Sequence, residues 1–269
     1  LNLIPKIKSN FVITSSKFKK HQLKKNLLIV DNVLLAVAKI TELFYPNSIN
    51  ENFISKKEIN NDYLSSKNIV LGSNVIIGKS VKIGKNTFIG HNSIIEDNVI
   101  IGNNCNIGSN VVIKKSILGN NVNILDGAII GKKGFGFFPK KNNNIRYPHI
   151  GMVIIGNNVE IGSNNTIDRG SLGNTIIGEN TFLDNQVHIA HNVKIGKNCI
   201  ITAQVGFAGS SEVGDNVSIG GQAGVSGHLK IGNNVQIGGG SGVLKNIPDN
   251  TKVMGYPAKD IRLFIKENK

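Results

Sequence analysis

The stretch from residue 176 to residue 207, IIGENTFLDNQVHIAHNVKIGKNCIITAQVGF, carries a bulky apolar residue at every sixth position. An α-helix repeats its face every 3.6 residues and a strand every 2, so neither element alone produces this period. A period of six is typical of a β-solenoid, in which each hexad forms a short strand and a turn. This spacing, called the ruler below, runs without a break through Ile177, Leu183, Ile189, Ile195, Ile201, Phe207, Val213, Ile219, Val225, Ile231, Ile237 and Val243.

The ruler also runs upstream, in blocks that are separated by slips of register. Glycine often follows a ruler residue, and we expect these glycines to let the backbone turn a corner without a Cβ penalty. Four residues after the ruler comes a small or β-branched residue that we expect to point inward as well. The upstream positions are Leu71, Ile77, Ile83, Ile89, Ile95, Ile101, Ile107 and Ile113, then Leu118, Ile124 and Ile130, then Ile155, Ile161 and Ile167.

Three hexads would close a triangular coil of about 18 residues, and successive coils would stack in parallel about 4.8 Å apart. Residues 18 apart in sequence then become vertical neighbours. The predicted fold class is therefore all-β, a parallel β-helix of hexapeptide repeats. It is joined to a partial α/β domain at the N-terminus and a short helix at the C-terminus.

Three segments are predicted along the chain. Residues 1–52 lack the ruler and look like the remnant of a small α/β domain, residues 53–247 form the solenoid, and residues 248–269 form a C-terminal segment. Within the solenoid, residues 132–152 interrupt the register and are expected to loop out. The first residue is Leu rather than Met, so we expect the chain to begin inside a longer protein.

Local signals refine the two ends of the chain. Residues 11–14 and 27–30 look like strands, and residues 33–40 look like a helix that Asp31 and Asn32 can cap and Pro46 closes. Residues 258–269 are predicted to form a short basic helix.

Composition excludes several classes of protein. The formal net charge is +14, but almost all of the excess is spread over Lys, without an RNA-binding signature or an aromatic platform. We therefore predict no nucleic-acid partner. A positive field favours acidic partners and at most peripheral contact with an anionic membrane. The sequence contains no apolar run of membrane-spanning length and no secretory signal, so we expect a cytoplasmic protein.

The two cysteines are predicted to be buried free thiols. Cys105 and Cys199 each stand four residues after a ruler position, where the side chain points inward. They lie 94 residues apart (199 − 105), too far for a disulfide between stacked coils.

The segment from Asp184 to Asn192, DNQVHIAHN, is the most informative for chemistry. His191 stands two residues past ruler residue Ile189, so its side chain should point outward. Vertical stacking places Gly209 one coil below it. His228 follows His191 by 37 residues (228 − 191), which places it about two strand spacings, or roughly 10 Å, away in the same chain. Gln186, Gln204 and Gln222 are spaced by 18 and predict a ladder of stacked amides.

Six motifs occur in a fixed order: GFGF at Gly134–Phe137, PHIG at Pro148–Gly151, TIDRG at Thr166–Gly170, DNQ at Asp184–Gln186, IAHN at Ile189–Asn192 and GH at Gly227–His228. In this order they resemble the UDP-3-O-(3-hydroxyacyl)glucosamine N-acyltransferases of lipid A biosynthesis. The resemblance covers residues from about 10 to about 262. It implies a left-handed solenoid, and a homotrimer with active sites between neighbouring prisms. It also implies an acyl carrier protein as donor and a UDP-glucosamine lipid precursor as acceptor. No resident cofactor and no metal are implied, because the phosphopantetheine arrives on the carrier protein.

The resemblance also implies roles for single residues. His191 would be the general base, because a neutral imidazole suits removal of a proton from an attacking amine. Asp184, favoured over Asn185, would orient it, and the Gly209 backbone N–H would stabilise the oxyanion. The substrate-binding residues would be Asn185, Gln186, His188, His228, Phe135 and Phe137. Gly240 and Gly242 would line an acyl groove without a bulky side chain, which predicts long donors.

Other functions stay open at this point. One is a different hexapeptide acyltransferase, either the lipid A O-acyltransferase or a CoA-dependent sugar N-acetyltransferase; the N-terminal remnant and the GFGF excursion argue against both. Another is a zinc hydratase like the γ-class carbonic anhydrases, which would use His188, His191 and His228. Its stacked ligands lie 36 residues apart, however, whereas the separations here are 37 and 40. The last is a purely structural solenoid.

Overall fold

The computed structural model describes residues 8–18, 26–46, 48, 61–139 and 144–268. The chain divides into two compact units. Unit 1 comprises residues 1–52 and 136–148, and unit 2 comprises residues 53–135 and 149–269.

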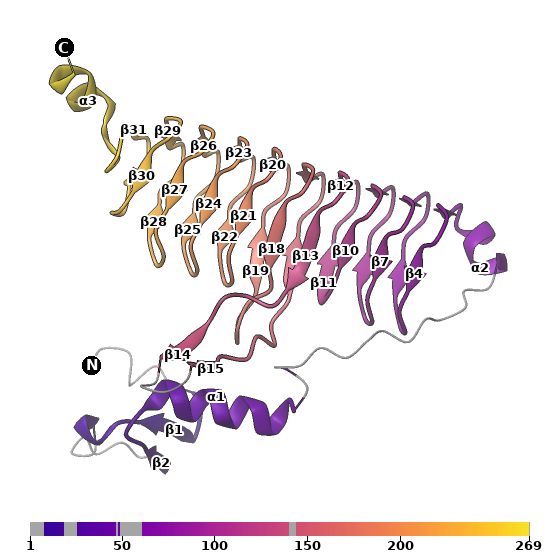
Figure 1. The fold of residues 1–269 in the computed structure, drawn as a ribbon, viewed down its shortest axis with the longest axis horizontal. Coiled ribbons are helices and arrows are strands. Elements are labelled where there is room, and N and C mark those ends of the chain that lie inside the picture. Colours follow the sequence, from indigo (N-terminus) through magenta and orange to yellow (C-terminus); the bar gives the residue numbers. More distant parts are fainter. Residues whose placement is uncertain (1–7, 19–25, 47, 49–60, 140–143, 269) are drawn as a thin grey trace. The chain divides into compact units, whose positions relative to one another are not determined.

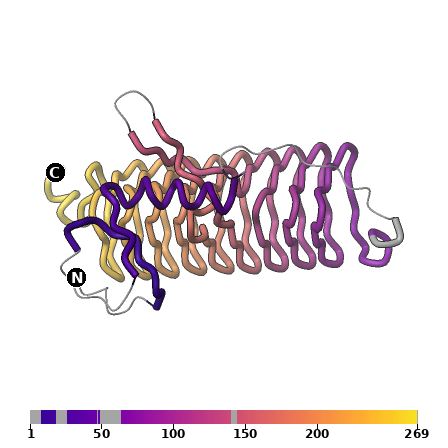
Figure 2. Tube along the Cα trace, turned by 90° about the horizontal axis from the view of Figure 1, so that it is seen from below, coloured from indigo at the N-terminus to yellow at the C-terminus, as the bar shows by residue number. Residues whose placement is uncertain are grey.

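Unit 2 is a prism with three walls, each a parallel β-sheet (Figures 1 and 2). Face I contains β4 (Ile76–Ile77), β7 (Ile94–Ile95), β10 (Val112–Ile113), β13 (Ile129–Lys132), β18 (Thr166–Asp168), β21 (His188–Ile189), β24 (Gly206–Phe207), β27 (Gly224–Val225) and β30 (Gly242–Val243). Face II contains β5 (Lys82–Ile83), β8 (Ile100–Ile101), β11 (Ser116–Leu118), β16 (Val153–Ile155), β19 (Thr175–Ile177), β22 (Lys194–Ile195), β25 (Glu212–Val213) and β28 (Lys230–Ile231).

Face III contains β3 (Val70–Leu71), β6 (Phe88–Ile89), β9 (Asn106–Ile107), β12 (Asn123–Ile124), β17 (Glu160–Ile161), β20 (Phe182–Leu183), β23 (Ile200–Ile201), β26 (Ser218–Ile219), β29 (Gln236–Ile237) and β31 (Lys252–Met254). A last strand, β32 (Lys259–Asp260), pairs antiparallel with β31. At the N-terminal end of the prism, α2 (Asn61–Ser66) precedes β3, and Leu64 packs against the core.

The ruler residues form the core, as predicted. Ile189 pairs in register with Ile167 above it and Phe207 below it, and all three are buried. Cys105 and Cys199 also point inward and are free thiols. Because burial of one large aliphatic side chain contributes about 1.5–3 kcal/mol, this continuous apolar column is the main source of stability.

The role expected for the glycines after the ruler is wrong. The left-handed backbone conformation falls two residues later, mostly on asparagine, as at Asn180 and Asn198, where φ is 55°. The glycines instead allow the coils to stack closely, since a Cβ on Gly178 would collide with the carbonyl of Gly196 in the next coil. The asparagine side chains form ladders between coils; the Asn180 Nδ2 atom donates to Asn198 Oδ1 at 3.2 Å.

The solenoid continues past the predicted boundary at residue 247. Ile231 bridges Ile247, and Ile237 pairs with Val253, so the final step between coils shortens to 16 residues (253 − 237) and leaves the ruler. The C-terminal helix, α3 (Ile261–Glu267), begins later than the predicted residue 258. Lys259 and Asp260 are held in β32, and the Asp260 side chain caps the helix by accepting from the Arg262 N–H at 2.9 Å.

Unit 1 contains the predicted strands and helix. The parallel strands are β1 (Phe11–Thr14) and β2 (Asn26–Ile29), with the 3-10 helix η2 (Ser16–Phe18) after β1. Helix α1 (Val33–Phe44) extends beyond residue 40, and the Asn32 side chain caps it by accepting from the Leu35 N–H at 2.9 Å.

The excursion from the prism is narrower than the predicted range of 132–152. β14 (Phe137–Pro139) and β15 (Asn144–Arg146) pair antiparallel in unit 1, whereas Lys132 still pairs with Asp168 in face I. Among the described helices, none combines the length and apolarity needed to cross a bilayer.

Burial predicts that both cysteines are chemically inert in the native protein. Burial raises the pKa of the Cys105 thiol and of the Cys199 thiol, which lowers the thiolate fraction at a given pH. We expect native alkylation by iodoacetamide at pH 8 to be about 100-fold slower than in guanidinium, because the thiolate is the nucleophile. Mass spectrometry over time measures both rates. Fast labelling of the native chain at either cysteine would contradict the inward orientation.

Candidate functional site

His191 lies on the edge between faces I and II, directly above Gly209. The ring is half-buried, and the Ser210 N–H donates to the His191 carbonyl at 3.0 Å, which fixes the stacking of the two coils. A Cβ on Gly209 would lie 2.7 Å from Cε1 and 2.8 Å from Nε2 of His191. The vertical arrangement of these two residues is therefore as predicted, and only glycine leaves room for the imidazole there.

Asn192 sets the tautomer of His191. The Asn192 Oδ1 atom accepts from the Ser171 N–H at 3.0 Å and from the Ser171 hydroxyl at 2.8 Å. A backbone N–H can only donate, so this amide atom is assigned as the oxygen. The same oxygen lies 3.1 Å from His191 Nδ1, which must then carry the proton. The lone pair of His191 is therefore on Nε2, the nitrogen that faces Gly209.

The Gly209 N–H is an available donor. At the equivalent turn position elsewhere, a side chain one coil below accepts from the N–H, as Asp97 does from Lys79 at 2.7 Å and Asp126 does from Ser109. Below Gly209 stands Gly227, which has no side chain to do so. Within the described part of the chain, the Gly209 N–H has no hydrogen-bond acceptor. A proton-accepting nitrogen and an unpaired N–H thus lie together.

Asp184 does not orient His191 within one chain, contrary to the prediction. Its Oδ1 atom accepts from the Asn185 N–H at 2.7 Å and its Oδ2 atom accepts from the Ala203 N–H at 3.1 Å. Both bonds lie on the edge between faces III and I. The chain crosses the whole of face I between Asp184 and His191, which is why nearness in sequence is misleading here.

Asn185 and Gln186 share that other edge. Asn185 Oδ1 caps the Ser163 N–H at 2.8 Å, and Gln186 accepts from Gln204 at 2.8 Å, as Gln204 does from Gln222. The predicted amide ladder is confirmed. Their expected contact with substrate stays a prediction, since these side chains already serve the prism.

His188 belongs to a polar cluster on face I. Its Nδ1 atom lies 2.7 Å from the Thr166 hydroxyl, and its Nε2 atom lies 4.0 Å from Asp168 Oδ2. Asp168 is buried and forms an ion pair with Lys132, whose Nζ is 2.5 Å from Oδ1. The sequence analysis did not identify Lys132, because it assigned residue 132 to the excursion, whereas Lys132 pairs with Asp168 in face I.

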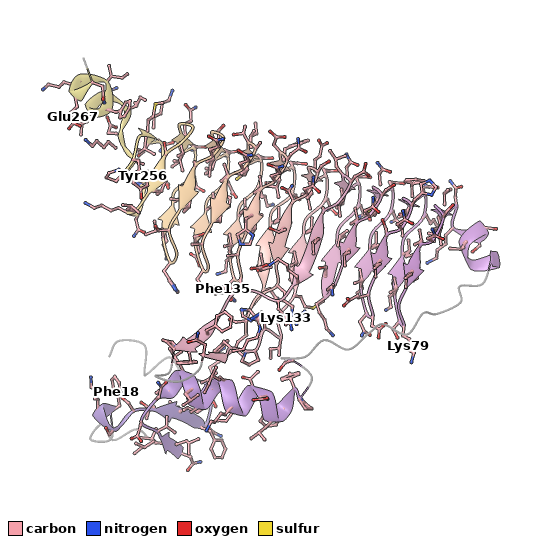
Figure 3. The ribbon with its side chains drawn as sticks, in the orientation of Figure 1. Phe18, Lys79, Lys133, Phe135, Tyr256 and Glu267 are labelled. Atoms are coloured by element: carbon pink, nitrogen blue, oxygen red, sulfur yellow. The ribbon has the colours of Figure 1, made fainter. Side chains whose placement is uncertain are left out.

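A strip without side chains begins below His188 on face I. Gly206 and Gly224 point outward there, and a Cβ on either would meet nothing within 4 Å. The strip ends at Gly242, where a Cβ would collide with the ring of Tyr256, a residue near the C-terminal end of the prism (Figure 3). The acyl groove expected at Gly240 and Gly242 is corrected accordingly. Gly242 is covered, and Gly240 stands on the edge between faces III and I with a φ of 66°.

The remaining predicted residues are distributed over both units. His228 lies on the same edge as His191, two coils below, and its N–H donates to the Gly209 carbonyl at 3.1 Å. Phe135 is 80% exposed at the point where the chain leaves the prism (Figure 3). Phe137 belongs to unit 1, where the Arg146 guanidinium lies 5.1 Å from its ring centroid. Across the described ranges of this one chain, no group of three His, Cys, Asp or Glu side chains could hold a metal ion.

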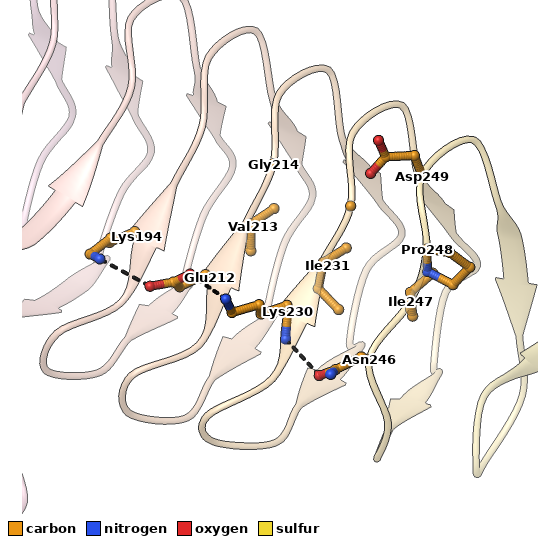
Figure 4. A pocket seen from close by; sticks show the side chains of 11 residues that line it. Lys194, Glu212, Val213, Gly214, Lys230, Ile231, Asn246, Ile247, Pro248 and Asp249 are labelled. Atoms are coloured by element: carbon orange, nitrogen blue, oxygen red, sulfur yellow. Dashed lines mark hydrogen bonds and ion pairs between the residues drawn. The ribbon is translucent and has the colours of Figure 1, made fainter. Parts of the chain in front are cut away.

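A hollow of about 590 Å³ on face II is separate from this site (Figure 4). Its wall carries the ladder Lys194–Glu212–Lys230, with ion pairs of 2.9 and 3.8 Å. The hydrogen bond from Lys194 lowers the pKa of Glu212. Because these charges are exposed and paired with one another, the hollow is a solvated surface feature.

Parts of this chain resemble known proteins. The bacterial transferase hexapeptide (six repeats) family matches residues 80–115 and 174–209. The UDP-3-O-acylglucosamine N-acyltransferase 2 of Legionella pneumophila is 56% identical over 84 residues, which are 31% of this chain and 24% of the relative. The enzyme of Rhizobium rhizogenes named UDP-3-O-acylglucosamine N-acyltransferase is 56% identical over 79 residues, 29% of this chain and 22% of the relative. These matches span about a quarter of the length of either relative.

Solved structures resemble the chain over a longer range. A UDP-N-acetylglucosamine acyltransferase of Francisella novicida has a TM-score of 0.66 at 27% identity. The aligned region covers 74% of this chain and 73% of the Francisella chain. LpxA of Bacteroides fragilis, a UDP-N-acetylglucosamine acyltransferase, has a TM-score of 0.63 at 30% identity, with coverage of 72% and 76%. The chain belongs to the hexapeptide-repeat acyltransferases.

The tautomer of His191 can be tested without any substrate. In the wild-type protein we expect the Nδ1–H form, because Asn192 Oδ1 accepts from Nδ1. Asn192→Leu removes that acceptor, so the Nε2–H form, which free imidazole favours, should become populated. The ¹⁵N chemical shifts of His191 distinguish the two forms. Asn198→Leu, which removes an amide from a ladder away from His191, is the matched control. An unchanged tautomer in Asn192→Leu would show that another group sets it.

Proposed function

We propose that the protein transfers an acyl chain from an acyl carrier protein to the 2-amine of a UDP-3-O-acylglucosamine. One observation carries this proposal. His191 Nε2 lies next to Gly209, whose N–H has no acceptor among the described residues, and both stand beside a strip free of side chains. Amide formation from a thioester needs a base, an oxyanion donor and room for an acyl chain, and these three features supply them. The names of the two relatives that are 56% identical over part of the chain support the same acceptor.

The reaction follows from the positions of these groups. The amine attacks the thioester carbonyl carbon, and its proton passes to His191 Nε2 as the C–N bond forms. The carbonyl oxygen becomes an oxyanion that accepts from the Gly209 N–H. Collapse of this intermediate breaks the C–S bond, and the leaving thiolate takes the proton from the imidazolium. Throughout the reaction, the Nδ1–H of His191 keeps its hydrogen bond to Asn192 Oδ1. The proposed chemistry needs no resident cofactor, and with a carrier protein as donor we propose a cytoplasmic location.

The acyl chain is proposed to lie over Gly206 and Gly224 and to end at Tyr256. Two coil spacings separate Gly206 from Gly242, so the floor of the strip is about 10 Å long. The Tyr256 ring lies across the far end. This replaces the sequence-based expectation of a groove without a stop.

A homotrimer is supported by the outward side chains of the prism. Faces I and II each carry an unbroken row of outward aliphatic residues, whereas on face III the outward row is interrupted by Asn106, Asn123 and Glu160 after Val70 and Phe88. Contact between two different faces of identical chains is heterologous and can close into a ring, as in a C₃ trimer. The apolar outward residues are Ile76, Ile94, Val112 and Ile129 on face I, and Ile100, Ile117, Ile154 and Ile176 on face II.

An O-acyltransferase is the second candidate. The solved structures that resemble the chain are named UDP-N-acetylglucosamine acyltransferases, and a histidine base can deprotonate a hydroxyl as well as an amine. The two candidates differ in the atom that is acylated. Incubation with both acceptors and mass spectrometry of the product decides between amide and ester.

Loss of His191 tests the proposed base. His191→Ala should lower kcat for amide formation by about 100-fold or more, because the general base is removed while the fold is kept. His91→Ala is the matched control. His91 also accepts a backbone hydrogen bond between coils, from Ser73 at 2.8 Å, but it stands far along the chain from the site. A rate within a few-fold of wild type for His191→Ala would remove His191 from the mechanism.

Tyr256 should set the length of the acyl chain. Tyr256→Ala should move the preferred donor to longer chains, since each added methylene that becomes buried contributes about 0.8 kcal/mol, or about fourfold in kcat/KM. Tyr256→Phe keeps the ring and should keep the wild-type length profile. The comparison uses kcat/KM over a series of acyl carrier protein donors. An identical profile for Tyr256→Ala would mean that the chain ends elsewhere.

A further inference from the structure

The chain leaves and rejoins the prism against His191. Gly134 precedes the excursion, and a Cβ there would lie 2.8 Å from both His149 Nε2 and His191 Cβ. His149 follows the excursion, and its ring centroid is 5.1 Å from that of His191 at an interplanar angle of 64°. His149 is 1% exposed, so its ring is enclosed and presents one fixed orientation to His191.

Arg169 fixes His149 from behind. Its Nε atom donates to the His149 carbonyl at 2.8 Å, and its Nη1 atom donates to the Gly131 carbonyl at 3.2 Å. The Arg169 N–H also donates to the Lys132 carbonyl at 3.0 Å. Arg169 is 4% exposed, so a buried guanidinium joins the backbone before the excursion to the backbone after it. The backbone of His149, which carries the ring, is therefore anchored to the prism through Arg169.

We propose that His149 is a positioning residue for His191. The hydrogen bond to Asn192 fixes one nitrogen of the His191 ring but still allows the ring to rock about that bond. An edge contact from a second direction removes this freedom and holds Nε2 toward Gly209. The geometry of such aromatic pairs is directional, with preferred edge-to-face arrangements at this separation. The inference rests on the proposed function only in taking His191 as the base.

The first test needs no activity, so its outcome is independent of the proposed reaction. In the wild-type protein the His191 ring should give one narrow set of ¹³C and ¹⁵N resonances. In His149→Ala the ring should sample further orientations, and its resonances should shift and broaden. His91→Ala, which removes a histidine remote from the site, should leave them unchanged. Identical His191 resonances in the wild type and in His149→Ala would overturn the proposal.

The second test separates positioning from general stability. His149→Ala should lower kcat by about tenfold with little change in KM for the sugar nucleotide, because binding is kept and the base is misaligned. His149→Phe retains a ring edge and should recover most of kcat, provided that circular dichroism shows it folded. If His149→Phe is folded but as slow as His149→Ala, or if His149→Ala keeps wild-type kcat, His149 does not act by holding the ring. If the wild-type protein acylates neither acceptor, the proposed function has failed, and the resonance test still decides the role of His149.

Discussion

The stacking of coils at one strand spacing is the constraint on which the rest of this structure depends. Backbone N–H groups in the turns need acceptors, and a side chain one coil away provides many of them, as Asp215 does for Lys197 at 2.7 Å. At many coils the same closeness leaves no room for a Cβ on the residue after the ruler, as at Gly84, which stands against the carbonyl of Gly102. Each position along an edge is therefore defined by the residue directly below it, and a change of one residue alters the chemistry of its vertical neighbour.

The ruler made the core and the vertical neighbours predictable. Ile189 over Phe207 and His191 over Gly209 follow from counting, because both pairs lie one coil apart. Counting residues did not predict on which edge of the triangular coil a side chain stands. Asp184 and His191 lie only seven residues apart (191 − 184), yet they stand on different edges of the triangle. The tautomer of His191 could not be predicted from the sequence either. It depends on Ser171, in the wider turn after β18, because Ser171 fixes the orientation of the Asn192 amide.

Tyr256 and His149 could not be predicted from the repeat, because each lies where the repeat is interrupted. The last coil is shortened to 16 residues (253 − 237), so no multiple of six or eighteen leads from Gly242 to Tyr256. His149 follows an excursion whose length the repeat does not fix, and its place beside His191 depends on the buried Arg169. Both residues lie at interruptions of the solenoid. In a fold this regular, interruptions are the positions where a side chain can reach a neighbour that the ladder would not provide.

The site is formed largely by omitting side chains. Along most edges, ladders such as Asn198 to Asn216 at 3.2 Å contribute about 0.5–1.5 kcal/mol per hydrogen bond. Below His191, at Gly209 and Gly227, there is no side chain to make such a bond. Gly227 leaves the Gly209 N–H without an acceptor among the described residues, and Gly206 and Gly224 leave face I bare. Gly209 is not buried, so its N–H is open to a partner from outside the prism, which in the proposed reaction is the oxyanion. In the proposed reaction, this N–H would therefore stabilise the transition state more than the ground state.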